Sequence, residues 1–452
     1  MIRKLGASRS ISIPAAPLSI IDTLNQNGYE AYVVGGCVRD SILGVKPKDW
    51  DIATSAKPDE IKKVFNKTID TGIQHGTVTV VIKGENFEVT TYRVDGEYAD
   101  SRRPKSVSFT SSLKDDLSRR DFTVNAIAYH PEKGFADPFN GMEDIKECVI
   151  RCVGDAGERF REDALRMLRA IRFSAQLNFS IDALTHKAIE DHNGLIRNIS
   201  QERIREELTK LLLSEYPERF LLLYRTYLLK HILPEFEPCF LTKQNNPYHI
   251  YSVAEHTIKA VASIRQTPVL RWTMLLHDLG KPLTKTTDEK GIDHFYGHPD
   301  KSFHIAQKIL YRLRFDKKTI DKVCRLVKLH DRPIELTCNA VRKAVYSVGD
   351  DIFPELLEVK EADYKAQNPD FLIKRLEKIS IIRSMYNNIK QENQCFSLNN
   401  LAVNGNILKQ EGFKEGKEIG NILKRLLDAV IDDPELNEKE KLLELVRRMP
   451  RQ

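Results

Sequence analysis

The chain has 452 residues, more than one hydrophobic core usually organises, so we expect three or more domains. Apolar residues make up 41% and charged residues 30%, as in soluble globular proteins, and no apolar run approaches the roughly 20 residues that a membrane helix requires. The net charge of +6 fits a polyanionic partner without requiring one.

The N-terminal stretch MIRKLGASRSISIPAAPLSI is basic, serine-bearing and free of acidic residues. It weakly resembles an organellar transit peptide, but a flexible leader is the favoured interpretation. The seven cysteines are scattered, without CxxC spacing or a secretory signal. This usage indicates reduced thiols and a cytoplasmic protein.

Helix signals and short β-branched strands alternate between about Ala16 and Ala128, which predicts a small α/β domain. From Asp155 onward the pattern becomes helical and strands essentially stop, with helices expected over Glu162–Phe173, Glu202–Ser214 and Arg219–Lys230. We therefore expect an α/β head followed by all-α domains. The boundaries fall near residues 145, 240 and 370, giving a head (1–145), a helical neck (146–240), a third domain (241–370) and a helical tail (371–452).

Two carboxylates, Asp49 and Asp51, stand two residues apart at the start of a predicted strand. Residues at i and i+2 of a strand point to one face, so both carboxylates converge on one spot. In the strand Phe87–Thr91 the side chain of Glu88 faces away from Phe87 and Val89, which makes it a candidate third carboxylate, although a solvated strand residue is an equal alternative. Such a group can hold two hard divalent cations for nucleotidyl transfer, as in polymerases.

Gly35 and Gly36 lie between a strand and a helix start, where backbone amides can approach a phosphate chain closely. A Gly-Gly turn alone is a weak signal. Arg39 adds a positive charge nearby, and an internal ion pair between Arg39 and Asp40 is compatible with that role.

Six motifs follow one another in the order GGxVRDxxLG, DxD, HGTV, RRDFTxNA, DPFxG and EDxLRxLRxxRF. They stand at Gly35–Gly44, Asp49–Asp51, His75–Val78, Arg119–Ala126, Asp137–Gly141 and Glu162–Phe173. In this order the first 240 residues resemble the class II tRNA nucleotidyltransferases, which are the CCA-adding enzymes and their bacterial poly(A) polymerase relatives, whose head has a polymerase-beta-like nucleotidyltransferase fold.

The resemblance implies that the helix Glu162–Arg172 acts as a protein template for the incoming base. Asp163 and Arg166 are three residues apart and are expected on one helical face. A carboxylate accepting from an exocyclic amine, beside a guanidinium donating to the ring, selects cytosine and adenine over uracil and guanine. Arg169 and Arg172 continue that face towards the triphosphate or the primer end.

The resemblance also assigns Asp121 to the sugar hydroxyls and Arg120, next to Arg119, to the phosphates. The polar stretch Glu97–Phe109 is expected to be a mobile loop, which in similar enzymes reshapes the pocket for ATP. HGTV resembles the tRNA enzymes more than the poly(A) polymerases.

Seven of the twelve histidines fall between His249 and His330. The pair His277-Asp278, followed by Gly-Lys-Pro, resembles the HD phosphohydrolases, in which a metal-activated water attacks a phosphoester. We expect His256, His277, Asp278 and Asp363 to bind a divalent metal that the residues do not identify, and His298 and His330 to add a second. His249, His294 and His304 are expected to be core or surface residues.

The C-terminal stretch from Leu401 resembles the tRNA-gripping tail of CCA-adding enzymes, less closely than the head does. Lys409, Lys414, Lys417 and Lys424 could contact phosphates, and a solvated helix face is an equal alternative.

The leading hypothesis is an enzyme that adds C and A from CTP and ATP to the 3′ end of tRNA, with Mg²⁺ at Asp49 and Asp51 and no obligate protein partner. A poly(A) polymerase or an A-adding enzyme is the alternative within the family. From another class, the chain could be an HD phosphohydrolase with an inert, RNA-binding nucleotidyltransferase module.

Overall fold

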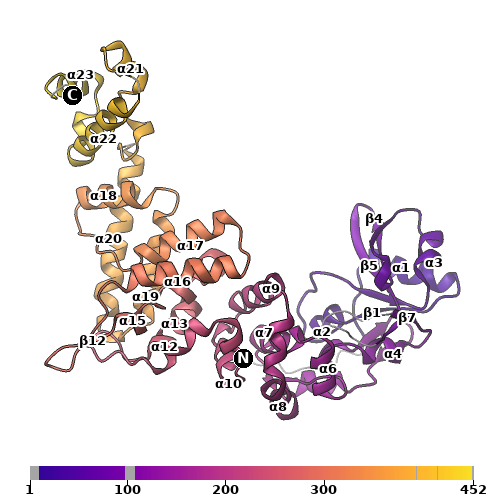
Figure 1. The fold of residues 1–452 in the computed structure, drawn as a ribbon. Coiled ribbons are helices and arrows are strands. Elements are labelled where there is room, and N and C mark those ends of the chain that lie inside the picture. Colours follow the sequence, from indigo (N-terminus) through magenta and orange to yellow (C-terminus); the bar gives the residue numbers. More distant parts are fainter. Residues whose placement is uncertain (1–9, 97–106, 393, 415, 450–452) are drawn as a thin grey trace. The chain divides into compact units, whose positions relative to one another are not determined.

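The computed structural model describes residues 10–96, 107–392, 394–414 and 416–449. The chain divides into two compact units, Met1–Glu237 and Pro238–Gln452, and each is described by itself (Figure 1). The finer division into four domains remains a prediction.

A seven-stranded mixed sheet forms the centre of the first unit. Its strands are β1 (Ala31–Val34), β2 (Ile52–Thr54), β3 (Thr68–Gly72), β4 (Thr77–Ile82), β5 (Glu85–Thr91), β8 (Ala128–His130) and β9 (Gly134–Ala136). They lie in the order β3-β4-β5-β2-β1-β8-β9, and all neighbours are antiparallel except β2 and β5. β1 is buried along its whole length, as expected of an apolar central strand. The predicted α/β head is confirmed.

The first helix, α1 (Ala15–Gln26), packs against β1 and β2 through Ile20, Ile21 and Leu24, which recur at helical spacing and are fully buried. The other short elements of this region are α2 (Gly36–Ile42), α3 (Pro58–Val64), α4 (Leu113–Ser118), α5 (Gly141–Lys146) and the strand pair β6 (Arg93–Asp95) with β7 (Val107–Phe109). Most of the predicted mobile loop, residues 97–106, lies outside the described residues, as do the first nine residues of the expected leader.

The rest of the first unit is helical: α6 (Ala156–Glu162), α7 (Leu165–Leu177), α8 (Ala183–His192), α9 (Gln201–Leu212), α10 (Leu221–Arg225) and α11 (Leu229–Ile232), with the short parallel pair β10 (Val149–Ile150) and β11 (Ser180–Ile181). Two helix predictions were wrong. The stretch predicted over Glu162–Phe173 is interrupted between α6 and α7. The one predicted over Arg219–Lys230 is interrupted because Tyr227 adopts a positive φ of 59°, which an α-helix cannot contain.

The second unit consists of α12 (Glu237–Leu241), α13 (Val253–Ser263), α14 (Pro268–Leu276), α15 (Lys281–Thr284), α16 (His298–Arg312), α17 (Lys317–Leu329), α18 (Cys338–Val348), α19 (Phe353–Lys365), α20 (Leu372–Gln391), α21 (Gly405–Gln410), α22 (Lys417–Asp432) and α23 (Lys439–Arg447), with a hairpin of β12 (Thr286–Thr287) and β13 (Asp293–His294). Strands therefore continue past residue 155, but only as two-residue pairs. α17 shows why the region is helical: Ile320, Val323, Cys324 and Val327 form one buried stripe against α14 and α16. None of the helices in the described ranges combines the length and apolar character that a membrane crossing requires.

Candidate functional site

Three carboxylates lie near one another where β2 begins, in the middle of the central sheet. Asp51 directly precedes β2, and Glu88 lies on β5 directly before Val89, the partner of Ile52 in the parallel register. Asp51, directly before β2, and Glu88, on the neighbouring β5, therefore stand level with each other. Glu88 is exposed between buried neighbours, as the alternation predicted. Asp49 and Asp51 are not themselves in a strand, contrary to expectation, because regular pairing begins only at Ile52.

The carboxylate of Asp51 is held in an unfavourable electrostatic environment. Its pKa is raised, first because partial burial removes water from the carboxylate, and then because Glu88 and Asp49 repel its charge; Arg120 acts in the opposite direction. Clustered carboxylate oxygens such as those of Asp49, Asp51 and Glu88 match the ligands that hard divalent cations such as Mg²⁺ prefer.

The Gly-Gly turn brings the backbone close to a basic side chain. Gly35 has a φ of 78°, and a Cβ there would lie 2.8 Å from Nη1 of Arg120. A side chain at this position would therefore displace Arg120 as well as strain the backbone. Arg39 makes the expected ion pair with Asp40, at 2.7 Å, and donates a second hydrogen bond to Asn125 at 2.6 Å.

Arg119 and Arg120 share one buried partner that the sequence did not suggest. Asp116, whose side chain is only 1% exposed, lies 2.7 Å from Nη2 of Arg119 and 3.4 Å from Nη2 of Arg120. An acidic residue this deeply buried needs such compensation. Asp116 therefore fixes both arginines at the edge of the candidate site.

Asp121 is fully engaged within the protein. It accepts hydrogen bonds from the backbone N–H of Phe122 (2.9 Å), from Asn125 (3.1 Å) and from Nε of Arg169 (2.8 Å). Burial opposes its ionisation, but the Arg169 guanidinium outweighs that effect and lowers the pKa of Asp121 to about 2. Asp121 is a fixed negative charge that holds Arg169 in place.

The predicted base-reading pair does not share a face of one helix. Asp163 ends α6 in an extended conformation, and its carboxylate accepts from the N–H of Leu165 at 3.0 Å, so it caps the start of α7. Arg166 lies in the first turn of α7, where it binds Glu162 at 2.5 Å and the carbonyl of Arg119 at 2.9 Å. The relative position of Asp163 and Arg166 is therefore set by the turn between α6 and α7, and not by the spacing of residues along one helix.

Two residues of α9 complete this region and were missed. Arg203 holds Asp163 with a two-point contact, Nη2–Oδ2 at 2.7 Å and Nη1–Oδ1 at 3.3 Å. Glu207 is buried, hydrogen-bonds Nε of Arg172 and lies 3.9 Å from Arg169. The available signal was an acidic residue inside the apolar stripe of Glu202–Ser214, because a buried glutamate needs a basic partner.

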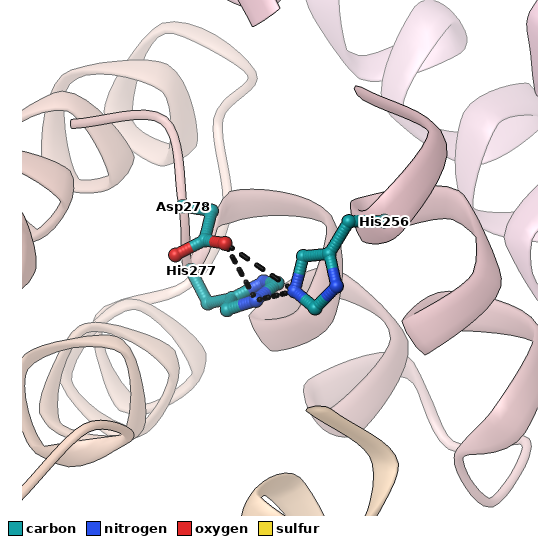
Figure 2. Close-up of side chains that lie close together, drawn as sticks. All are labelled: His256, His277 and Asp278. Carbon is teal, nitrogen blue, oxygen red and sulfur yellow. Dashed lines mark hydrogen bonds and ion pairs between the residues drawn. The ribbon is translucent and has the colours of Figure 1, made fainter. Parts of the chain in front are cut away.

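A second constellation lies in the other unit. Six side chains form what we call the histidine–aspartate cluster; they come from α13, the end of α14, α16, the end of α17, and α19, and are His256, His277, Asp278, His298, His330 and Asp363. All six are buried. Figure 2 shows the side chains of His256, His277 and Asp278 turned towards one another. The structure therefore brings together every predicted residue of this site.

The bridging position in the cluster belongs to Asp278. Its Oδ2 lies 3.3 Å from Nε2 of both His256 and His277. Its Oδ1 lies 3.3 Å from Nε2 of His298 and 3.6 Å from that of His330. Asp363 approaches the first pair, at 2.9 Å from His256 and 3.6 Å from His277. This divides the donor atoms into two groups that share one carboxylate.

The four imidazoles are oriented by the backbone. Nδ1 of His256, His277, His298 and His330 lies 3.1, 2.7, 2.8 and 2.7 Å from a carbonyl oxygen. Each Nδ1 must therefore donate, which leaves the Nε2 lone pair facing the cluster. The Nε2 atoms of His256 and His277 lie 3.3 Å apart, and those of His298 and His330 lie 3.1 Å apart. Two lone pairs this close repel each other, and a shared cation would stabilise the arrangement. The donor set fits divalent transition metals or Mg²⁺.

Of the three histidines expected to be bystanders, His249 lies closest to the cluster, with its ring 5.1 Å from that of His256. Burial lowers the pKa of His249 to about 2, which keeps it neutral. His294 instead pairs with Asp288 at 3.0 Å.

Comparison with protein families identifies three segments. Residues 31–151 match the poly(A) polymerase head domain, residues 178–240 a probable RNA and SrmB-binding site of polymerase A, and residues 298–446 a putative tRNA nucleotidyltransferase domain 2. None of these descriptions concerns a phosphohydrolase, so that reading of the histidine–aspartate cluster stays a prediction.

Similarity to individual proteins extends over nearly the whole chain. The CCA-adding enzyme of Pediococcus pentosaceus is 33% identical over 432 residues, covering 95% of this chain and 97% of the relative. That of Limosilactobacillus reuteri is 35% identical over 440 residues, with 97% of each covered. Among solved structures, the Bacillus stearothermophilus CCA-adding enzyme in complex with CTP is 31% identical, with a TM-score of 0.69 over 95% of this chain and 96% of its own. A Thermotoga maritima CCA-adding enzyme complexed with tRNA, 22% identical with a TM-score of 0.59, shares the fold.

Proposed function

This chain belongs to the CCA-adding tRNA nucleotidyltransferases, and on that basis we propose which of its residues add C and A to the 3′ end of tRNA. The enzyme extends RNA without a nucleic-acid template. The observation that carries the assignment of the active site is the group of three carboxylates, Asp49, Asp51 and Glu88, beside Arg120 and the Gly-Gly turn. Since its substrate is tRNA, we place the enzyme in the cytoplasm.

Enzymes of this kind use divalent metal ions. We assign two Mg²⁺ ions to Asp49 and Asp51, with Glu88 as a further ligand or as the base that accepts the proton of the 3′ hydroxyl. Bound there, such ions lower the pKa of the attacking hydroxyl and stabilise the departing pyrophosphate. Asp49 and Asp51 hold the reacting groups at the start of β2, and the register between β2 and β5 fixes the position of Asp51 relative to Glu88.

Base selection is assigned to Asp163 and Arg166. Asp163 accepts from the exocyclic amine of cytosine or adenine, and Arg166 donates to the neighbouring ring nitrogen. The present contacts do not block this role. A carboxylate has about four lone-pair sites, of which Arg203 uses one on each oxygen and the N–H of Leu165 uses the second on Oδ1, so one on Oδ2 is left for the base. Arg203 instead orients the carboxylate, and Glu162 does the same for Arg166.

The remaining contacts to the nucleotide are assigned to residues whose positions are fixed by acidic partners or by the backbone turn. Gly36 allows close approach of the triphosphate. Asp121 is the candidate for the sugar hydroxyls by family resemblance, and a sugar hydroxyl there would replace one of its present contacts to Phe122, Asn125 or Arg169. The residues assigned to the phosphates and the primer end are Gly35, Arg39, Arg119, Arg120, Arg169 and Arg172.

The test uses purified protein with tRNA lacking CCA, or ending in CC, and labelled CTP or ATP supplied separately. A CCA-adding enzyme adds two C residues and then one A. Long A tails on unrelated RNA would instead identify a poly(A) polymerase, and extension of the CC-ending tRNA alone would identify an A-adding enzyme. An Asp49→Ala, Asp51→Ala variant that still elongates RNA would refute the assigned site.

A second function is supported by the four Nε2 atoms and two carboxylates of the histidine–aspartate cluster. We propose that the cluster binds a divalent metal and hydrolyses phosphoesters at RNA 3′ ends, which restores the hydroxyl that the first site extends. The metal supplies an activated water when bound. A His277→Ala, Asp278→Ala variant should lose both its bound metal, measured by elemental analysis, and hydrolysis of a 2′,3′-cyclic nucleotide; retention of the parent values for both would exclude this function.

For the chain as a whole we assign residues 1–145 to the catalytic head, 146–240 to the neck that reads the base, 241–370 to the phosphohydrolase domain and 371–452 to the tail that grips tRNA. The family matches at residues 31–151 and 178–240 support the first two assignments.

A further inference from the structure

The histidine–aspartate cluster opens into a pocket of about 780 Å³. Asp278, His298, His330 and Asp363 all line it. The donor atoms of the cluster are thus reachable by a molecule larger than water, and the walls of the pocket decide which one.

Two basic side chains of α20, Arg375 and Lys378, line the same pocket one helical turn apart. Other cations nearby are neutralised: Lys281 lies 2.7 Å from Asp278, and Lys285 lies 2.7 Å from Asp293. Within the described ranges, no carboxylate lies at ion-pair distance from Arg375 or Lys378. These two cations therefore offer their charge to the pocket.

Arg375 is held in position by aromatic rings. Its guanidinium carbon lies 4.7 Å from the ring centre of Tyr248 and 4.9 Å from that of Tyr364, and both tyrosines line the pocket. Tyr248 in turn packs edge-on against Phe371 at 5.0 Å. Stacking on two rings restricts the long side chain while leaving its hydrogen-bond donors in the guanidinium plane free.

An exposed ring completes the pocket. Tyr296 is 79% exposed and stacks on His294 with ring centres 5.3 Å apart and an interplanar angle of 7°. Both residues line the pocket. An exposed ring face supported from behind is the kind of surface on which an unpaired base stacks.

We propose that Arg375 and Lys378 bind a second phosphate of the substrate, so that the cluster acts on the end of a polynucleotide in preference to a free mononucleotide. This inference rests on the phosphohydrolase function proposed for the cluster. The terminal phosphate ester lies at the cluster, the preceding phosphodiester lies at Arg375 and Lys378, and a base stacks on Tyr296. Hydrolysis consumes one water: its oxygen bonds to phosphorus, one ribose P–O bond breaks, and one of its protons passes to the departing ribose oxygen.

The first test compares two substrates with the same reacting group, cytidine 2′,3′-cyclic phosphate alone and a tetranucleotide that ends in it. An Arg375→Gln, Lys378→Gln variant should lose about tenfold in kcat/KM on the tetranucleotide, the effect of one or two lost charge-assisted hydrogen bonds, and change less than about twofold on the mononucleotide. The control is Lys374→Gln on the same helix, an exposed lysine outside the pocket. Equal losses on both substrates, or no loss on the tetranucleotide, would overturn the inference.

The second test does not depend on hydrolysis. A tetranucleotide with a 3′ phosphate and 4-thiouridine as its last base is cross-linked to the full-length protein by light, and the modified peptide is identified by mass spectrometry. Cross-links to the segment containing His294 and Tyr296 are expected, and they should weaken in the Arg375→Gln, Lys378→Gln variant but not in Lys374→Gln. Absence of such cross-links overturns the subsite even where hydrolysis is observed. Cross-links without hydrolysis support the subsite and refute the phosphohydrolase function instead.

Discussion

Arg203→Met tests whether its two-point contact fixes Asp163, the carboxylate proposed to read the base. The pair is partly shielded, with side-chain exposures of 26% for Arg203 and 16% for Asp163, and its contacts measure 2.7 and 3.3 Å. A charge-assisted hydrogen bond contributes about 1.5–3 kcal/mol. Because the second contact is long and water retains some access, we take the lower end, about 1.5 kcal/mol, which is roughly a tenfold effect on an equilibrium or rate ratio.

The expected result is a change in selectivity. On tRNA lacking CCA, the ratio of kcat/KM for CTP to that for UTP should fall about tenfold, because a reoriented Asp163 no longer distinguishes an exocyclic amine from a carbonyl. The control is Arg205→Met on the same helix, where the guanidinium of Arg205 lies 3.8 Å from Glu206. The melting temperatures of the Arg203→Met and Arg205→Met variants should differ little. An unchanged CTP-to-UTP ratio, or an equal loss in the control, would refute the role of Arg203.

Three further outcomes follow from the site. Asp51→Asn should abolish nucleotide addition yet leave the melting temperature unchanged or raised, because it removes a charge that its neighbours repel. The pKa of Asp121 is lowered to about 2, so its ionised form stabilises the fold above about pH 4, and this stabilisation disappears as the pH falls towards 2. Asp121→Asn should lower the free energy of unfolding, measured in urea at pH 6, by about 2 kcal/mol and flatten its dependence on acid pH. Gly35→Ala should abolish activity through the collision with Arg120, whereas Gly44→Ala, at a similar φ of 70° with open space around it, should cost only about 1 kcal/mol of stability and keep activity.

The sequence predicted what depends on local periodicity. Glu88 was placed correctly because its strand alternates strictly between buried and exposed residues. The interruption at Asp163 could not be predicted from periodicity, because apolar recurrence continues through Leu165 and Leu168 and the break arises from one side chain capping the next helix. The pairing of Glu207 with Arg172 joins residues 35 positions apart, a tertiary contact that spacing along the chain does not encode. Asp116 is different, because it lies three and four residues before Arg119 and Arg120; its pairing is local, and only its burial depends on the tertiary fold.

The histidine–aspartate cluster shows the complementary case. Its six members are spread over more than a hundred residues, and no periodicity relates them. The His-Asp pair and its family resemblance identified them, whereas the orientation of three rings follows from local structure: His277, His298 and His330 each bond to a carbonyl three residues earlier. The ring of His256 is instead oriented by a tertiary contact, to the carbonyl of Ala366. The sequence motif therefore identifies the candidate metal-binding residues, and the position of a residue at the end of a helix determines which ring nitrogen faces the cluster.

The charges around the proposed nucleotide site favour binding of metal and nucleotide together. The charged residues predicted for this site, counted together with their direct ion-pair partners, comprise nine carboxylates and seven guanidinium groups. Their net charge is about −2. The acidic members are Asp40, Asp49, Asp51, Glu88, Asp116, Asp121, Glu162, Asp163 and Glu207, and the basic members are Arg39, Arg119, Arg120, Arg166, Arg169, Arg172 and Arg203.

A nucleoside triphosphate, with a charge of about −4, would be repelled by such a site if it bound alone, because most of the arginines are already paired with carboxylates. Two divalent cations bring four positive charges and return the complex to the net charge of the free site. On this proposal the arginines act mainly by position, held in fixed geometry by their acidic partners, and the metal ions compensate the charge of the substrate.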